Sequence, residues 1–327
     1  MTSLRMPADA PTTPSASRSL LRFLPWLGTL VILGAAAWFL RHYLASMSWH
    51  DIKAAWTRLP PSRIAGSIAC TCVSFTVLAA FDVLAVRSAV PGRVPVWLAA
   101  FAGVVSNAMS NTLGFPALTG GAVRYRIYTA VGLTAGDIAR IVWLAGMGVA
   151  LGFVVVTTGA LVWEPSIAHG WGRFPGVALV LFLVVGLAWL ARKPRSVTIW
   201  RWTLIFPSAP VAGTQLLMGA VEMTAAISAF YILLPPESAP PFVDFLPIYV
   251  AAVLAGVVSH VPGGLGVFET IMIASFPPEA RPDLLTALVC YRLCYGLLPL
   301  AVSLLSLGVF EFRRRAGPVS STAGNDE

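Results

Sequence analysis

The amino-acid sequence predicts an all-α polytopic membrane protein, and two observations support this fold class. The chain is 57% hydrophobic with a mean hydropathy of +0.79, and only 11% of its residues are charged. Soluble domains carry about 25% charged residues. Several windows of about 20 apolar residues are long enough to cross a bilayer as helices. We expect about six full spans plus two re-entrant helical hairpins, or eight or more helices in total.

The ends of the chain are expected to lie outside the folded domain. Residues 1–18 are rich in Pro, Ser, Thr and Ala, which predicts a disordered cytoplasmic tail. A single transmembrane domain is expected over 19–312, followed by a cytoplasmic tail at 313–327. The first span, about 23–40, is long enough to remain in the membrane, so no cleaved signal peptide is expected. An amphipathic stretch at about 48–58 is expected to lie at the membrane surface.

Five further apolar runs predict the remaining spans, each bounded by charge, proline or glycine. One has a clear helix start, because Thr134 is followed by Asp137 in the first turn, where an acidic residue suits the helix dipole. These predicted spans are about 63–86, 135–162, 175–191, 211–234 and 283–311.

Two other apolar runs are interrupted and predict helical hairpins. The second arm of each is too short or too charged to cross a membrane alone, which favours re-entrant hairpins; full crossings would give the same topology. The arms and breaks are 95–113 and 119–131 around Gly114-Phe115-Pro116, and 245–260 and 265–276 around Pro262-Gly263-Gly264.

The net charge of +8 indicates membrane topology rather than nucleic-acid binding. Basic residues gather in the two tails and in the loops at 87–93 and 192–201, and basic loops face the cytoplasm. With both termini and both loops inside a bacterial cytoplasmic membrane, the two hairpins enter from opposite faces. No nucleic-acid partner is expected.

This topology predicts an inverted repeat in which each half consists of a span, a hairpin and a span. The halves are roughly 62–162 and 211–311. Residues 102–107, Ala-Gly-Val-Val-Ser-Asn, nearly repeat at 255–260 as Ala-Gly-Val-Val-Ser-His. Each copy precedes a break and a charged segment. Paired, interrupted apolar segments in two halves indicate a transporter binding site.

The first hairpin is expected to bind a phosphate. Gly120 and Gly121 would expose backbone N–H groups at a helix start, which attracts anions. Arg124 and Arg126 add donors that match a phosphate. The alternative is that both arginines extend to the membrane surface.

Charged residues inside apolar segments are further candidates, since a charge at the bilayer centre costs about 2.5–3.5 kcal/mol. Glu269 is expected to pair with Arg292 or Arg140, or to bind a cationic headgroup. Asp82 lies near the inner end of its span and is expected to reach the interface. The complete set of predicted substrate-binding residues is Gly120, Gly121, Arg124, Arg126, Asn107, Arg140, His260, Gly263, Gly264, Glu269, Arg292 and Glu222.

Within that set, three residues have individual expectations. Asn107 is expected to hydrogen-bond between helices. His260 would either titrate or cap the arm that it ends. Glu222 lies in the middle of a span without a partner evident from the sequence.

The sequence contains no motif for a catalytic centre. Gly263-Gly264-Leu265-Gly266 lacks the Lys-Ser/Thr ending of a nucleotide-binding loop. The four cysteines lie in apolar runs, where they behave as small buried hydrophobes, and histidine is scarce. We expect no catalytic residue, cofactor or metal, so any transport would be passive or coupled to an ion gradient.

Several of these motifs resemble the transmembrane flippase region of the lysylphosphatidylglycerol synthase/flippase family, the multiple peptide resistance factor. The resemblance covers most of about 60–311. It depends on Thr119-Gly-Gly-Ala-Val-Arg-Tyr-Arg126, Asp137-Ile-Ala-Arg-Ile141, Ser259-His-Val-Pro-Gly-Gly-Leu-Gly-Val-Phe-Glu269, and Tyr291-Arg292 leading to Leu298-Pro299-Leu300.

The resemblance implies a membrane region that moves aminoacylated phosphatidylglycerol to the outer leaflet. A separate soluble domain of that family performs tRNA-dependent aminoacyl transfer, and we expect no room for it before Glu327. The leading hypothesis is therefore a lipid translocator whose partner is phosphatidylglycerol or its aminoacylated form. The alternatives are a membrane-embedded lipid-modifying transferase and a partner subunit of a separately encoded lipid synthase. Small residues in many spans would also allow a homodimer.

Overall fold

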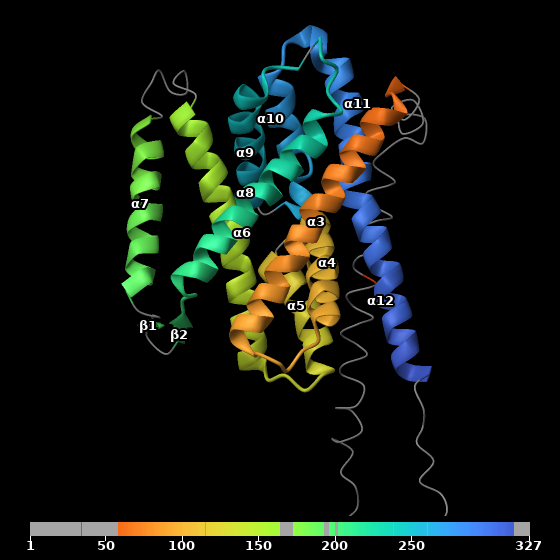
Figure 1. Ribbon diagram of the computed structural model, residues 1–327. Coiled ribbons are helices and arrows are strands. Elements are labelled where there is room, and N and C mark those ends of the chain that lie inside the picture. The colour runs from red at the N-terminus through yellow and green to blue at the C-terminus, as the bar shows by residue number, and fades with distance from the viewer. Residues whose placement is uncertain are drawn as a thin grey trace, which may run out of the picture.

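The computed structural model is an α-helical bundle with one short β-hairpin (Figure 1). It describes residues 34, 58–114, 116–163, 173–192, 196–199, 202–237, 239–259 and 261–316. The expected N-terminal tail and first span, nearly all of the amphipathic stretch at 48–58, His260 and most of the C-terminal tail lie outside the described residues.

The helices of the first half match the expected segments closely. Pro116 occupies the first position of its helix, where its missing N–H costs nothing. The helices are α3 (Pro61–Ala89), α4 (Val96–Leu113), α5 (Pro116–Thr129), α6 (Ala135–Trp163) and α7 (Arg173–Arg192).

The segment after α7 contains a β-hairpin, which the all-helical prediction missed. Strands β1 (Ser196–Ile199) and β2 (Trp202–Ile205) form an antiparallel hairpin in which Ser196 pairs with Ile205.

The second half repeats the order of long helix, broken pair and long helix. Its elements are α8 (Ala209–Tyr231), α9 (Phe242–Val258), the 3₁₀ turn η2 (Pro262–Gly264), α10 (Val267–Ser275), the 3₁₀ turn η3 (Pro278–Ala280), α11 (Arg281–Tyr291), the π-helical segment η4 (Arg292–Leu297) and α12 (Leu298–Ala316).

Four helical stretches are long and apolar enough to cross a membrane, which supports a helical membrane protein. They are Pro61–Ala89, Ala135–Val162, Phe174–Ala191 and Pro278–Arg313. The helix α8 takes the place of the expected span at 211–234, but Gln215 and Glu222 make it less apolar. Six full spans and re-entrant hairpins stay predictions.

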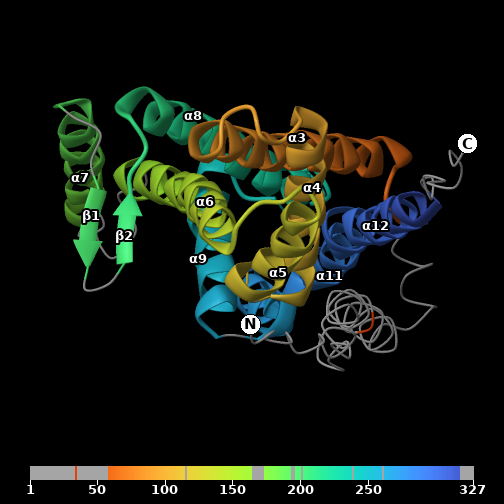
Figure 2. The same ribbon diagram turned by 90° about the horizontal axis from the view of Figure 1, so that it is seen from below.

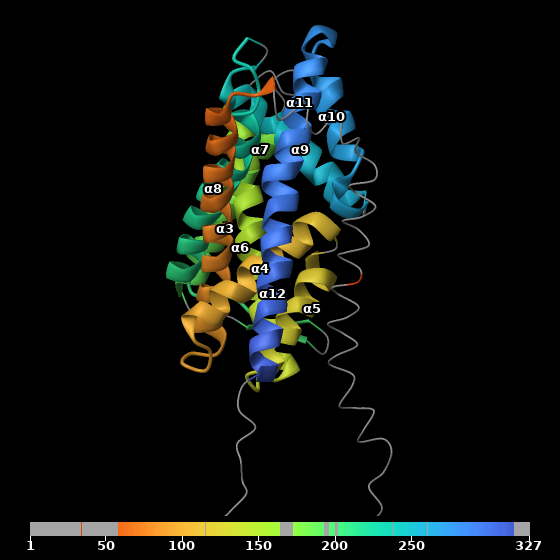
Figure 3. The same ribbon diagram turned by 90° about the vertical axis from the view of Figure 1, so that its right-hand side faces the viewer.

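The two broken helix pairs lie at opposite ends of the bundle. The pair α4–α5 occupies one end and the pair α9–α10 the other (Figures 1 and 3). Seen from below, α3 and α8 lie on one side, with α5 and α9 on the opposite side of α4 and α6 (Figure 2). Each broken pair packs against a long helix of the other half, because α4 contacts α12 and α9 contacts α6.

The tips of the two pairs meet at an apolar cluster. Leu297 is buried there against Leu113 from the end of α4, Leu265 from the second tip, and Leu293. Thr112 Oγ1 also lies 3.4 Å from the carbonyl oxygen of Gly296 in η4. Contact between α4 and η2 completes this junction. Segments about 150 residues apart, by the numbering of Leu113 and Leu265, therefore form one site.

Candidate functional site

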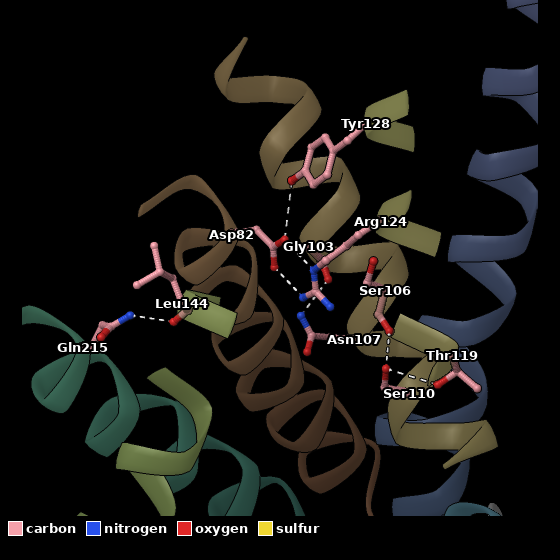
Figure 4. Close-up of polar contacts among 10 residues, drawn as sticks. All are labelled: Asp82, Gly103, Ser106, Asn107, Ser110, Thr119, Arg124, Tyr128, Leu144 and Gln215. Atoms are coloured by element: carbon pink, nitrogen blue, oxygen red, sulfur yellow. Dashed lines mark hydrogen bonds and ion pairs between the residues drawn. The ribbon is translucent and has the colours of Figure 1, made fainter. Parts of the chain in front are cut away.

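The first charged pair is buried under the first helix pair. Arg124 of α5 donates from Nε to Asp82 Oδ1 at 2.7 Å and from Nη2 to Oδ2 at 2.6 Å (Figure 4). Asp82 is 0% exposed and Arg124 is 6% exposed. The expectation that Asp82 reaches the interface is wrong, because its side chain turns inward to compensate the buried guanidinium.

Glycines allow the helices around this pair to approach closely. A Cβ atom on Gly103 would lie 2.9 Å from Asp82 Cβ, and one on Gly120 would lie 2.5 Å from Ser110 Oγ. A Cβ atom on Gly121 would meet nothing within 4 Å. Both Gly120 and Gly121 lie inside α5, so the expectation that they expose N–H groups at a hairpin tip is wrong. Gly120 instead provides space between α4 and α5.

Polar side chains continue from this pair along α4. Asn107 Nδ2 donates to the Gly103 carbonyl at 2.8 Å, so this amide bonds within its own helix rather than between helices as expected. Ser110 Oγ donates to the Ser106 carbonyl at 2.8 Å, and Thr119 Oγ1 lies 3.5 Å from Ser110 Oγ (Figure 4). Thr119 Oγ1 also donates to the Gly114 carbonyl at 2.8 Å. The Asp82–Arg124 pair therefore lies beside a polar strip between α4 and α5.

A second ion pair connects α5 to α12. Arg126 Nη2 lies 2.9 Å from Glu311 Oε1, and the two side chains are only 11% and 9% exposed. Glu311 was not among the partners predicted from the sequence. This pair attaches the second arm of the first helix pair to the end of the chain's last helix.

The third ion pair belongs to the second helix pair and confirms an expected partnership. Arg292 Nη2 lies 2.6 Å from Glu269 Oε1. The other predicted partner, Arg140, is exposed on α6 and forms no ion pair with any described residue. Arg292 also donates from Nη1 to the Gly263 carbonyl at 2.9 Å, and its guanidinium lies 5.3 Å from the centre of the Phe268 ring.

The turn before α10 requires glycine. Gly263 and Gly264 both have φ of +62°, in the left-handed region. A Cβ atom on Gly264 would lie 3.2 Å from the Cα of Gly256. Gly103 and Gly256 are the equivalent glycines of the two Ala-Gly-Val-Val-Ser motifs, and each lies at a close contact within its own half.

Exposure distinguishes the Arg292–Glu269 pair from the Arg124–Asp82 pair. The side chains of Arg292 and Glu269 are 17% and 25% exposed, against 7% and 0% for Arg124 and Asp82. Solvent or a small polar group can therefore reach the pair on the second helix pair but not the pair on the first.

Glu222 has partners that the sequence did not reveal. Ser74 Oγ of α3 donates to Glu222 Oε1 at 2.8 Å, and the Tyr295 hydroxyl of η4 donates to the same oxygen at 3.3 Å. The two hydroxyls lie 2.9 Å apart. Glu222 thus lies between the two halves of the bundle rather than at either tip.

The described residues contain no group of three or more His, Cys, Asp or Glu side chains that could hold a metal ion. His260, one of the predicted site residues, lies outside the described part of the chain. Among the described residues, the arrangement is one of buried ion pairs and hydroxyl groups inside the bundle.

Comparison with known proteins identifies relatives but not an activity for this chain. No family model matches the sequence. The phosphatidylglycerol lysyltransferase of Staphylococcus haemolyticus is 21% identical over 309 residues, which are 92% of this chain but 35% of that protein. The inner membrane protein YbhN of Escherichia coli is 30% identical over 193 residues, 56% of this chain and 60% of that protein.

A relative from Synechocystis matches this chain over most of the length of both proteins. The uncharacterized protein slr0712 of Synechocystis is 31% identical over 289 residues, which are 85% of this chain and 88% of that protein. The chain therefore belongs to the family of helical membrane proteins that includes slr0712 of Synechocystis.

Proposed function

We propose that this protein is a lipid translocator of the bacterial cytoplasmic membrane, which moves an anionic or aminoacylated phospholipid between leaflets. One observation carries the proposal: the two broken helix pairs come from opposite ends of the bundle and meet at their tips, and each contributes one residue to an arginine–carboxylate pair. Irregular backbone at membrane depth is tolerated only where it is buried in protein or lines a wet cavity.

The chemistry of the two ion pairs suits a phosphate-containing headgroup. A guanidinium binds a phosphate with the same forked geometry as a carboxylate. A headgroup phosphate can therefore replace Glu269 as the partner of Arg292, and in the first helix pair replace Asp82 as the partner of Arg124. Each exchange leaves the guanidinium compensated, which avoids a bare charge in an apolar environment.

The difference in exposure assigns an order to these exchanges. Because the Arg292–Glu269 pair is the more exposed, the conformation seen here would admit a headgroup at the second helix pair first. Gly263 and Gly264 would shape that entry, and Arg126 and Asn107 would line the exit under the first pair. The acyl chains would stay in lipid, along apolar surfaces such as α7, where Leu181, Phe182 and Val185 are exposed.

The connections of the two helix pairs suggest how the bundle would alternate access. The arms α5 and α10 are both tied by ion pairs to one bent element, α11–η4–α12, through Glu311 and Arg292. A π-helical segment interrupts that element at its centre, and such segments are frequent at functional sites. Movement there would release one arm while the other stays attached, as inverted repeats do in transporters.

The relatives agree with this substrate class and location. The matched lysyltransferase is named for phosphatidylglycerol, and its match extends over 92% of this chain. YbhN is named as an inner membrane protein. We therefore take phosphatidylglycerol and its lysyl form as first substrates, with a homodimer or a separately encoded lipid synthase as the partners to look for.

Reconstitution in vesicles tests the proposal. Headgroup-labelled phosphatidylglycerol or lysyl-phosphatidylglycerol would be placed in one leaflet, and its arrival in the other leaflet measured. We expect the Arg292→Ala variant to lose about tenfold or more in rate, because a lost charge-assisted contact of 1.4 kcal/mol already costs a factor of ten. Arg93→Ala is the matched control, since it removes an exposed ion pair with Asp137.

Two outcomes would contradict the proposal. Equal rates with and without protein, for both lipids, would exclude translocation of this class. The appearance of a new lipid species in the vesicles, with unchanged leaflet distribution, would instead support the lipid-modifying alternative.

A further inference from the structure

Glu222 is a buried carboxyl group without a cationic partner among the described residues. It is 4% exposed, lies on α8, and forms no ion pair with any Lys, Arg or His of the described chain. The other carboxylates of the bundle interior, Asp82, Glu269 and Glu311, each have an arginine. Unlike these three carboxylates, Glu222 has no arginine among the described residues that would compensate a negative charge.

The groups that face Glu222 are hydroxyls. Ser74 and Tyr295 contact its Oε1 atom, and the titratable side chains that interact with it electrostatically are Tyr249 of α9, Tyr291 of α11 and Tyr295 of η4. Tyr249 and Tyr291 share a hydrogen bond of 2.6 Å, and Tyr291 stacks on Tyr295 with ring centres 5.2 Å apart. Arg292, adjacent in sequence to Tyr291, is held by Glu269.

An ionised Glu222 would be unfavourable in this arrangement. Removing an ion from water costs several kcal/mol even after the protein relaxes, and hydroxyl donors offset only part of that cost. A buried group in this position becomes neutral instead. Intramembrane acidic residues of this kind mark ion pathways and proton relays.

We propose that Glu222 is a proton-binding site, neutral in the conformation seen here, and that it couples a proton gradient to lipid movement, a coupling that rests on the proposed function. When water reaches the group from one side, the carboxyl O–H bond breaks and the proton passes to water, leaving a hydrated carboxylate. After the bundle opens to the other side, the carboxylate accepts a proton from the water there. The bundle then closes around Glu222, which is again neutral.

The location of the group connects its charge to the shape of the bundle. Its two hydroxyl partners come from α3 of the first half and from η4 between α11 and α12. An ionised Glu222 needs water, and water can enter only if α3, α8 and η4 separate. Protonation therefore favours the closed junction, and loss of the proton favours the open one.

Infrared spectroscopy of the purified protein in lipid nanodiscs tests the site directly. A protonated carboxyl group has a carbonyl stretching band that an ionised one lacks. We expect this band near neutral pH in the wild type and in the matched variant Glu269→Gln, and its loss in Glu222→Gln. If Glu222→Gln fails to fold, ¹³C-labelling of glutamate side chains in the wild type must shift the band. A wild-type spectrum without such a band would overturn the proposal.

Transport under imposed pH gradients tests the coupling. We expect the wild-type rate of labelled phosphatidylglycerol movement to depend on the direction of the gradient, and Glu222→Gln to lose that dependence. Equal wild-type rates under the two gradient directions would overturn the coupling. An infrared band from Glu222 would in that case still support the proton-binding site. If the infrared band of Glu222 is present but no lipid moves under any gradient, the proposed function and the coupling are both rejected. Only the proton-binding site would then be supported.

Discussion

At the scale of residues, the interior of this protein is organised by compensated charge. Three arginine–carboxylate pairs connect helices that are distant in the sequence, with N–O distances of 2.6 to 2.9 Å. The Asp82–Arg124 pair is the most deeply buried of them and uses two parallel hydrogen bonds. Removing one partner of such a pair leaves a bare charge in an apolar environment, which is far more costly than removing both.

This pair leads to a stability prediction. Asp82→Ala should destabilise the protein by about 3–5 kcal/mol, because Arg124 would keep a buried, uncompensated charge. The double variant Asp82→Leu with Arg124→Met should recover most of that loss, since apolar side chains of similar size replace both charges. The midpoint of thermal unfolding in detergent measures all of these variants. Arg93→Ala, which breaks an exposed pair, is the control and should shift the midpoint little. A double variant no more stable than Asp82→Ala would contradict the assignment.

At the scale of elements, small residues determine how closely the long helices cross. α6 and α8 touch through Gly152 and Gly219, where a Cβ atom on Gly219 would lie 2.5 Å from the Cα of Gly152. Backbone atoms cannot move aside as a flexible side chain can, so this crossing depends on glycine at both positions.

Two substitutions on the same helix test this contact. Gly219→Ala should destabilise the bundle by about 1–3 kcal/mol or more through overpacking. Gly213→Ala, at a position where a Cβ atom would meet nothing within 4 Å, should be neutral or stabilising by up to about 1 kcal/mol, since alanine is the better helix former. Thermal unfolding in detergent compares them. Equal midpoints for the two variants would show that α6 and α8 do not cross at these glycines.

The π-helical interruption between α11 and α12 also has a local cause. Pro299 lacks an N–H group, and its ring would clash with the carbonyl of Tyr295 in a regular α-helix. The widened π-helical turn just before it, Arg292–Leu297, removes that conflict. The same turn presents Arg292 to one helix pair and Tyr295 to Glu222.

At the scale of the whole molecule, two broken helix pairs enter from opposite ends of one bundle. The turn before α4 and the end of α12 lie at one end, and the α10–α11 turn lies at the other (Figures 1 and 3). The basic loops expected in the cytoplasm belong to the first of these ends.

Thiol labelling in intact cells tests this orientation. Single cysteines at the exposed positions Glu237 and Glu279 should react with a membrane-impermeant reagent added from outside. A cysteine at the exposed position Gly136 should react only after the membrane is permeabilised. The four native cysteines would first be replaced by alanine. Labelling of all three positions from the same side would contradict the inverted arrangement.

Much of the fold was predictable because it depends on local sequence. The spans at 135–162 and 175–191 agree with α6 and α7 to within about two residues, as expected for element boundaries. The helix start at Thr134 is confirmed, with its Oγ1 accepting from the Asp137 N–H at 3.2 Å. The breaks at Gly114 and at Pro262-Gly263-Gly264 are also confirmed, and Gly114, Gly263 and Gly264 there have positive φ, with which an α-helix cannot continue.

The candidate site was only partly predictable from the sequence. Arg292 and Arg140 were both predicted as partners for Glu269, and the structure pairs it with Arg292, which lies in the same half, 23 positions away. Gly120 and Gly121 were assigned to a tip because the sequence does not show that α5 begins at Pro116. Asp82 was assigned to the interface because its position along α3 was known, but the direction of its side chain was not.

The sequence by itself determined the fold class, the apolar spans, the two breaks and the presence of charge inside apolar segments. Only the tertiary structure decided which charges compensate one another: Arg124 with Asp82, 42 positions away, and Arg126 with Glu311, 185 away. It also decided that Glu222 bonds to the hydroxyl of Ser74, 148 positions away. Hydropathy and helix breaking act over a few neighbouring residues, so one chain segment reveals them. Pairing depends on the rotation of each helix about its axis and on contacts between distant helices, which are set when the whole bundle packs.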